Sequence, residues 1–342
     1  MLIPCFSSGP ALVVYYGQQV EITFHNLLIN EATTIHMHGF LERNMDWMDG
    51  VSGLSHCPIN PGESFTYRVF AEPAGTFWYH AHLGDQFGMG IQGPLIVKDR
   101  PDDLPAKRGD DPLPEFDDEF VSMFQDWGSG TGESAFLTAS FVHWFAAYSY
   151  GLEENECYEE TKNAAGITTS DNDFHSATVN GMGWRFDEEG NPINDNLPLE
   201  VYMVEEGGKY RFRLISASVI FSFMVSVDHH TLNVIAMDGH DIQTYQADYV
   251  VLFPGDRFDF WIDASDPLGT GLYWMRFETL EYADHANERI NFHHWVPAIV
   301  KYSSCERGTG AGGRHRWVSE NAIVWGLIDT IQKKKHLSFV ID

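Results

Sequence analysis

The chain has 342 residues, of which 44% are hydrophobic and 14% aromatic, so it is long enough for two globular domains with ordinary apolar cores. Its 49 acidic and 21 basic residues give a formal net charge of −28, which argues against nucleic acid and anionic membranes as partners, because both attract basic surfaces. No apolar run of about eighteen residues occurs, so we expect no membrane span, and the first residues lack the basic start and apolar stretch of a signal peptide.

The N-terminal third of the chain is expected to form short strands separated by turns. Residues 20–26 alternate apolar and polar side chains at a period of two, which is typical of a half-buried strand. The pairs Asp49-Gly50 and Pro61-Gly62 are turn signals. Runs of β-branched and aromatic residues between such turns predict strands at 11–16, 20–26, 33–39, 65–69, 75–82 and 94–97.

Two of these strands carry the two His-x-His pairs of the sequence, His36 with His38 and His80 with His82. Because successive side chains of a strand point to opposite faces, the two members of each pair lie on one face. The strands are far enough apart in sequence to become neighbours, so four imidazoles can converge on one pocket. Imidazole binds copper, zinc, iron and nickel, and such a pair can serve two adjacent ions as easily as one. The pattern therefore predicts a metal site.

The second half is expected to be another β-domain behind a linker. Residues 99–119 contain several prolines among many acidic side chains, which is typical of a linker. Beyond it, residues 136–150 fit either a helix or a buried strand. From residue 176 onward strands recur at short intervals, as in a sandwich or barrel. This half is expected to start at 120–124 and to close at 299–302, and its clearest buried strands are expected at 231–236 and 249–253.

These motifs resemble a known family. The stretches TTIHMHG at 33–39, WMDGVSGLSHCPINPG at 47–62 and AGTFWYHAHLGDQ at 74–86 resemble the first domain of the three-domain multicopper oxidases, which include laccases, ascorbate oxidases and ferroxidases. The stretches KYRFRLI at 209–215 and VLFPGDRFDF at 251–260 resemble the second domain of that family. Met37 stands where the family usually has tryptophan, at a position that is not a ligand.

The resemblance implies an all-β fold, with two cupredoxin-like Greek-key β-barrels in tandem and the third domain of the family absent. We expect a first domain at residues 1–98, N-terminally truncated and carrying the His-x-His motifs, followed by the linker at 99–119. A second domain without copper ligands is expected at 120–304, and a non-homologous tail at 305–342. Within the tail, residues 321–331 fit a short helix.

The resemblance also implies a trinuclear copper centre. His36 is expected to bind its type 2 copper, and His38, His80 and His82 are expected to bind its type 3 pair. Asp49 corresponds to an acidic residue that helps to deliver protons during oxygen reduction in the family, and as a residue type it equally fits a simple turn.

The residues that follow the second pair, Asp85 and Gln86, are candidates for orienting the imidazole rings.

Parts of the family's copper chemistry are missing from this sequence. The third domain brings a His-Pro-x-His-x-His-Gly stretch and a His-Cys-His stretch, and neither occurs here. A type 1 copper needs two His and one thiolate, yet none of the four cysteines has His on both sides. In many relatives the cysteine at the position of Cys57 pairs with the third domain, so we expect Cys57 to be free. The chain is therefore expected to hold half of the trinuclear site and no type 1 site.

The function implied is that of a laccase-like multicopper oxidase, which oxidises phenols, aromatic amines or metal ions and reduces O2 to water. Its partners are O2 and a small reducing substrate, and relatives imply secretion. With half a site, we expect this chain to be inactive alone. One alternative is a non-catalytic copper-binding or interaction module of cupredoxin type. Another is a two-domain copper enzyme that trimerises to complete its sites, which the missing His-Cys-His argues against.

Overall fold

The computed structural model describes residues 9–84, 86–99, 113–127, 161–162, 168–169, 176–186, 192–193, 198–280, 283–285, 288–290, 295–303 and 334–341. Within these residues the chain is almost entirely β-structure, and the one helical segment is a single 3-10 turn, η1 at Asp46–Met48. The expected all-β fold is confirmed. None of the described segments is a helix long and apolar enough to cross a lipid bilayer.

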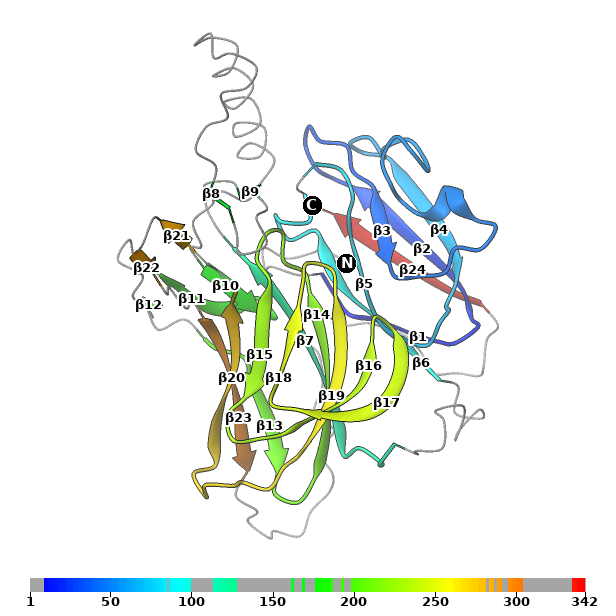
Figure 1. The fold of residues 1–342 in the computed structure, drawn as a ribbon. Helices are drawn as coiled ribbons and strands as arrows, with labels where there is room; N and C mark the ends of the chain where they lie inside the picture. The colour runs from blue at the N-terminus through cyan, green and yellow to red at the C-terminus, as the bar shows by residue number, and fades with distance from the viewer. Residues whose placement is uncertain are drawn as a thin grey trace.

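Two sheets enclose the first core of the molecule, a buried cluster that includes Phe24, Ile35, Tyr67 and Phe77 (Figure 1). One sheet has the strand order β1-β6-β5-β3 and the other the order β24-β2-β4. The alternating burial along β2 reproduces the period of two in its sequence. The bounds are β1 Leu12–Tyr15, β2 Gln19–Asn26, β3 Ile35–His38, β4 Ser64–Phe70, β5 Gly75–Ala81, β6 Gln92–Lys98 and β24 Lys334–Ile341.

Two larger sheets enclose the second core, a buried cluster that includes Phe124, Phe212, Phe260 and Phe277. Their strand orders are β12-β11-β10-β7-β14-β19-β16-β17 and β13-β23-β20-β15-β18, and two short pairs, β21-β22 and β8-β9, accompany them. The bounds are β7 Asp118–Asp126, β8 Thr161–Lys162, β9 Thr168–Thr169, β10 Ser176–Val179, β11 Met182–Phe186, β12 Pro192–Ile193, β13 Val201–Glu205, β14 Lys209–Ser216, β15 Phe223–Val227, β16 Leu232–Met237, β17 His240–Ala247, β18 Tyr249–Leu252, β19 Arg257–Asp263, β20 Leu272–Thr279, β21 Ala283–His285, β22 Glu288–Ile290 and β23 Trp295–Ser303.

The strands expected from the sequence are therefore present in both halves, each within a few residues of its expected bounds. The two cores match the two β-domains implied by the resemblance. Three expectations lie wholly or largely outside the described residues: the character of 136–150, the short helix at 321–331 and most of the linker at 99–119. Cys57 is exposed and has no disulfide partner among the described residues.

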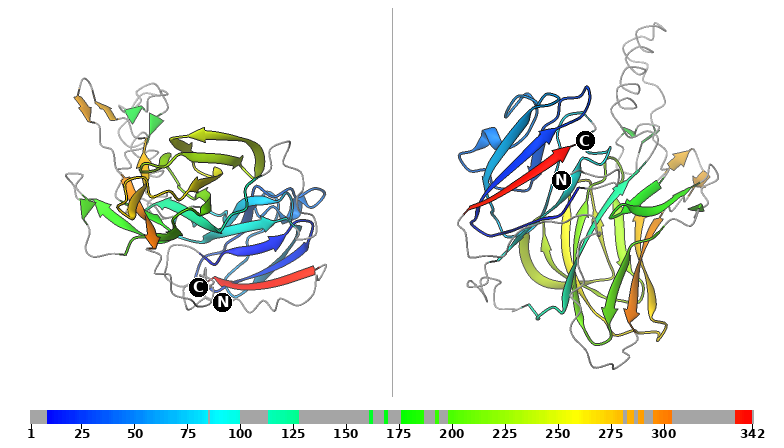
Figure 2. Two further views of the ribbon diagram at one scale, coloured as in Figure 1. Left: turned by 90° about the horizontal axis from the view of Figure 1, so that it is seen from below. Right: turned by 180° about the vertical axis from the view of Figure 1, so that it is seen from behind.

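The C-terminal segment forms a strand of the first lobe, by which we mean the sheets around the first core. The sheets around the second core are the second lobe. Strand β24 pairs in parallel with β2 in unbroken register, from Gln19 opposite Lys334 to Asn26 opposite Ile341. The three ribbon views agree that these two strands lie side by side (Figures 1 and 2). The sequence motifs identified residues 305–342 only as a non-homologous tail, because a parallel partner from the far end of the chain leaves no local signal.

This pairing predicts an alternating response to proline. Along a strand, successive N–H groups point to opposite sides, so only every second residue of β24 donates to β2. Proline introduced singly at Leu337 and at Ser338 should therefore have unequal effects. The variant at the residue whose N–H points to β2 should lose about 1 kcal/mol more of its unfolding free energy than the other. Urea unfolding of the two variants measures this. Equal effects at both positions would argue against the ladder.

A buried ionic network joins the two lobes. Arg213 on β14 binds Glu119 through Nη2 at 2.9 Å and Asp259 through Nη1 at 3.1 Å. The same guanidinium donates to Thr76 Oγ1 of β5 at 2.8 Å, which is a contact between the second lobe and the first. Arg211 also binds Asp259, and that carboxylate is 2% exposed. Arg213 and Asp259 are almost fully buried and Glu119 is 26% exposed, so the ion pairs are largely shielded from water and hold the two lobes together next to β5.

Candidate metal centre

The two His-x-His strands are direct neighbours. Strands β3 and β5 pair in antiparallel fashion, with His36 opposite His80 and His38 opposite Trp78. On β3 the alternate residues Ile35 and Met37 are buried in the first core, so the imidazoles between them face the other way. The local alternation in the sequence and the pairing of the strands together bring the four imidazoles to one place.

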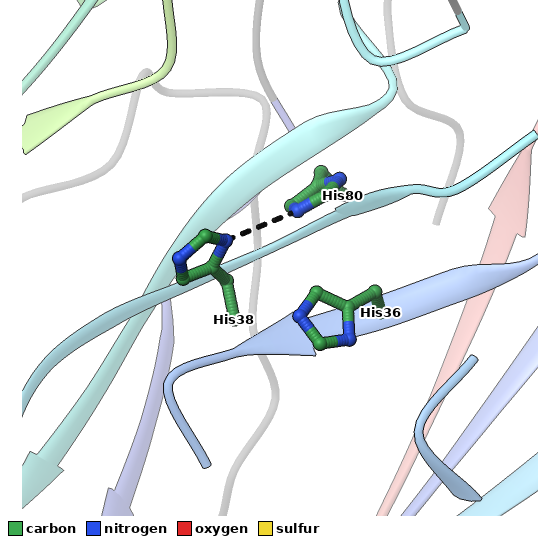
Figure 3. A group of neighbouring side chains, drawn as sticks. All are labelled: His36, His38 and His80. Carbon is green, nitrogen blue, oxygen red and sulfur yellow. Dashed lines mark hydrogen bonds between the residues drawn. The ribbon is translucent and has the colours of Figure 1, made fainter. Parts of the chain in front are cut away.

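The imidazoles are close enough to share an ion. One ring nitrogen from each of His36, His38 and His80 lies within 4.8 Å of the others. Nδ1 of His38 lies 3.4 Å from Nε2 of His80, the pair joined by the dashed line in Figure 3. His82, just beyond the end of β5, has its ring centroid 5.5 Å from that of His36 and 5.8 Å from that of His80. Within the described part of the chain, this is the single group of three ligand-type side chains with such spacing.

Hydrogen bonds decide which nitrogen of each ring can bind a metal. Nδ1 of His36 lies 2.7 Å from the carbonyl oxygen of Asp49, and Nδ1 of His80 donates to the carbonyl oxygen of Ala81 at 2.9 Å. Each bond places the proton on Nδ1 and makes Nε2 the nitrogen with a lone pair for a metal. In the metal-free site the lone pair of His80 Nε2 accepts a hydrogen bond from Nδ1 of His38, which a bound ion would replace. His38 instead presents Nδ1 to the cluster. The donor set is therefore three neutral imidazole nitrogens, which fits copper or zinc.

The environment keeps these rings neutral. Burial lowers the pKa of His80 well below its usual range. Burial, with the nearby Arg257 guanidinium as a smaller cause, lowers the pKa of His38 to about 3. Burial also lowers the pKa of His36, although Asp49 opposes the shift. Neutral imidazoles need to lose no proton before they bind a metal.

The lowered pKa of His38 predicts a pH dependence of stability. The unfolded ring takes up a proton near pH 6.5, whereas the folded ring does so near pH 3. Between these values the unfolded state binds more protons, so stability falls as the pH falls, by about 1.4 kcal/mol per pH unit. The unfolding free energy of the metal-free protein should therefore drop more steeply from pH 6.5 to 4.5 than that of His38→Gln. Parallel slopes would mean that the folded ring accepts the proton.

Asp49 lies beside the cluster. Its carboxylate is 3.2 Å from Nδ1 of His36, and its side chain is 39% exposed. Glu42, which the sequence did not single out, lies next to it. Burial, with Asp49 as the second cause, raises the pKa of Glu42 to about 8, which favours the neutral acid form of this side chain. The available signal was an acidic residue shortly after His38, which is too weak to stand out on its own.

The other candidates lie elsewhere. The side-chain nitrogen of Gln86 donates to the carbonyl oxygen of Ala32 at 2.8 Å and to Glu31 at 3.3 Å, so its described contacts do not include an imidazole. Asp85 lies outside the described residues. His230, one of the histidines without ligand spacing, has both nitrogens occupied, by the Asp228 carbonyl oxygen and by the Tyr302 hydroxyl at 2.7 Å each. It is therefore a structural residue.

The comparisons with known proteins identify a family. Family models described as multicopper oxidase match residues 6–102 and 143–303. Laccase-3 of Thanatephorus cucumeris is 30% identical over 97% of this chain and 56% of its own length. The laccase of Phlebia radiata is 33% identical over 78% of this chain and 44% of its own length.

Solved structures give the same picture. The laccase from Botrytis aclada is 26% identical with a TM-score of 0.62, over 92% of this chain and 51% of that one. The blue copper oxidase from Nitrosomonas europaea, at 24% identity and a TM-score of 0.59 over 87% of this chain and 77% of that one, shares the fold. The chain spans about half the length of the laccases it matches.

Proposed function

This chain belongs to the multicopper oxidase family, and on that premise we propose that it is part of a laccase-like oxidase, to which it contributes one half of a trinuclear copper centre. The observation that carries the proposal is the convergence of His36, His38 and His80, with His82 beside them. The reaction is the oxidation of phenols, aromatic amines or metal ions, coupled to the reduction of O2 to water. The relatives favour a secreted location.

The side chains divide the work as follows. His36 and His80 would hold copper through Nε2 and His38 through Nδ1, with His36 on the type 2 side and His38, His80 and His82 on the type 3 side. Bound copper supplies one-electron redox chemistry towards O2. Asp49 holds the ring of His36 by its Nδ1 and, being partly exposed, can exchange protons with water. It is the residue that we propose to deliver protons to the centre.

The 342 residues supply no type 1 site in this proposal. A type 1 copper needs a thiolate with two His, and Cys57, the free cysteine among the described residues, is exposed with only His56 preceding it. Electrons from a reducing substrate therefore have no entry point in this chain. The half-site should bind copper weakly, and these residues alone should not consume O2.

The test is to load the purified chain with Cu²⁺ and record its absorption spectrum and O2 consumption with a phenol as reductant. We expect weakly bound copper, no blue thiolate–copper band and no O2 consumption. A blue band together with turnover would contradict the proposal.

A second candidate function is a non-catalytic copper-binding module, favoured by the absence of a type 1 motif in the sequence. In such a module these imidazoles are the complete ligand set, so the chain should bind copper tightly without a second half of the site. The strength of Cu²⁺ binding, measured by equilibrium dialysis, separates the two candidates.

A further inference from the structure

One wall of the histidine cluster is supplied by the second lobe. The turn between β18 and β19 places Gly255 against the ring of His38, with a backbone φ of +91°. A Cβ on Gly255 would lie 3.0 Å from Cε1 and 3.3 Å from Nε2 of His38. These are closer than ordinary contacts, so the ring edge packs on the bare backbone of the glycine. Nδ1, bonded to the same Cε1, would lie 3.9 Å from that Cβ and faces His80.

The turn that carries Gly255 is fixed to its own sheet. The N–H of Gly255 donates to the carbonyl oxygen of Ser216 at 2.9 Å, and the N–H of Ser216 donates to the carbonyl oxygen of Asp256 at 3.0 Å. Within the turn, the N–H of Phe253 donates to the Asp256 carboxylate at 2.8 Å. The turn therefore has little freedom to retreat from the His38 ring.

Arg257 ties the same turn to the strand that carries His80. Its Nη1 donates to the carbonyl oxygen of Gly255 at 3.0 Å, and its Nε donates to the carbonyl oxygen of Thr76 on β5 at 3.2 Å. The guanidinium also pairs with Asp238 at 3.1 Å and lies over the ring of Phe77, and Arg257 is 5% exposed. One planar group thus holds the turn and β5 at a fixed separation.

We infer that Gly255 is a positioning residue for His38, and that Arg257 keeps it in place. The second lobe, which provides no ligand in the proposed function, sets the direction in which one ligand points. Nδ1 of His38 lies 3.4 Å from Nε2 of His80. A tilt of the His38 ring away from position 255 therefore moves the nitrogen that is proposed to bind copper. Disturbing the groups that orient a metal ligand typically weakens metal binding by about 10–100-fold. The copper readout below rests on the proposed function, whereas the second readout does not.

The test compares Gly255→Ala with Gly207→Ala. Gly207 has nearly the same backbone, with φ of +88°, but a Cβ there would meet nothing within 4 Å. Both variants carry the same backbone strain, so both should lose melting temperature, and Gly255→Ala should lose more because its Cβ also presses on the His38 ring. Only Gly255→Ala should also weaken Cu²⁺ binding, by about 10–100-fold. Arg257→Lys keeps the charge beside Asp238 but loses the planar fork, and should weaken binding in the same direction.

A metal-free readout makes the outcome independent of copper. The Cε1–H resonance of His38, assigned with His38→Gln, should shift in Gly255→Ala and stay in place in Gly207→Ala. If the wild type binds no copper, the proposed function fails and this resonance still decides the inference. The inference is overturned if the His38 Cε1–H resonance has the same position in Gly255→Ala as in Gly207→Ala, regardless of how either variant binds copper. If Arg257→Lys leaves both readouts unchanged, the role of Arg257 is overturned.

Discussion

Replacing His80 with Gln should abolish copper binding by the chain. His80 is the ligand of β5 that lies close to both imidazoles of β3. Its Nε2 lies 3.4 Å from Nδ1 of His38, and its ring centroid lies 5.3 Å from that of His36. Removing an outer contact of a ligand typically costs about 10–100-fold in affinity, so removing a ligand should cost more. Equilibrium dialysis against Cu²⁺, followed by metal analysis, measures the loss.

Glutamine is chosen because His80 is 7% exposed, so a smaller side chain would leave a cavity. The control is His240→Gln, at an exposed position in β17. We expect that variant to bind as the wild type does. Unchanged copper binding in His80→Gln, at an unchanged melting temperature, would mean that copper binds somewhere else.

Replacing Arg213 with Met should lower the free energy of unfolding by about 3–5 kcal/mol, the usual cost of removing one partner from a buried ion pair. Methionine keeps much of the volume, so the loss reports the charge. Glu119 and Asp259 would each lose a partner, and Thr76 would lose the donor that links the lobes. Urea unfolding measures the change, and Lys209→Met is the control. Its pair with Asp263 is exposed, so its removal should cost about 0–1 kcal/mol.

The same network predicts how the difference in unfolding free energy between the wild type and Arg213→Met depends on pH. Burial alone would raise the pKa of Glu119, but Arg213 and then Lys98 hold it at about 2. The ionised Glu119 therefore contributes stability above its unfolded pKa of 4.5, and that contribution is lost as the pH falls from 4.5 towards 2. The gap between wild type and Arg213→Met should narrow across this range. A gap that stays constant down to pH 2 would exclude Glu119 as its source.

The sequence predicted those parts of the fold that local patterns encode. The period of two along β2 and β3 is a local property, so it identified strands and placed His36 and His38 on one face. The spacing of the two His-x-His pairs then predicted a shared site, and the rings do converge. At this site the strand alternation and the His-x-His motif lie in the same few residues, so the local sequence was sufficient.

Long-range contacts could not be predicted in this way. Gly255 is a glycine in a turn signal, and nothing near it in sequence indicates the ring of His38. Arg213 lies in an alternating strand where a surface position is the ordinary expectation, yet it is buried against Glu119, far away in sequence. The parallel pairing of β24 with β2 is of the same kind, since the two segments are at opposite ends of the chain.

The account depends on imidazoles from β3 and β5 acting as one copper site. Electron paramagnetic resonance of the Cu²⁺-loaded chain tests this most directly, because nitrogen ligands split the copper signal. We predict splitting from several equivalent imidazole nitrogens in the wild type, and its disappearance when His36, His38, His80 and His82 are all replaced by Gln. The same nitrogen splitting in that fourfold variant would contradict the account.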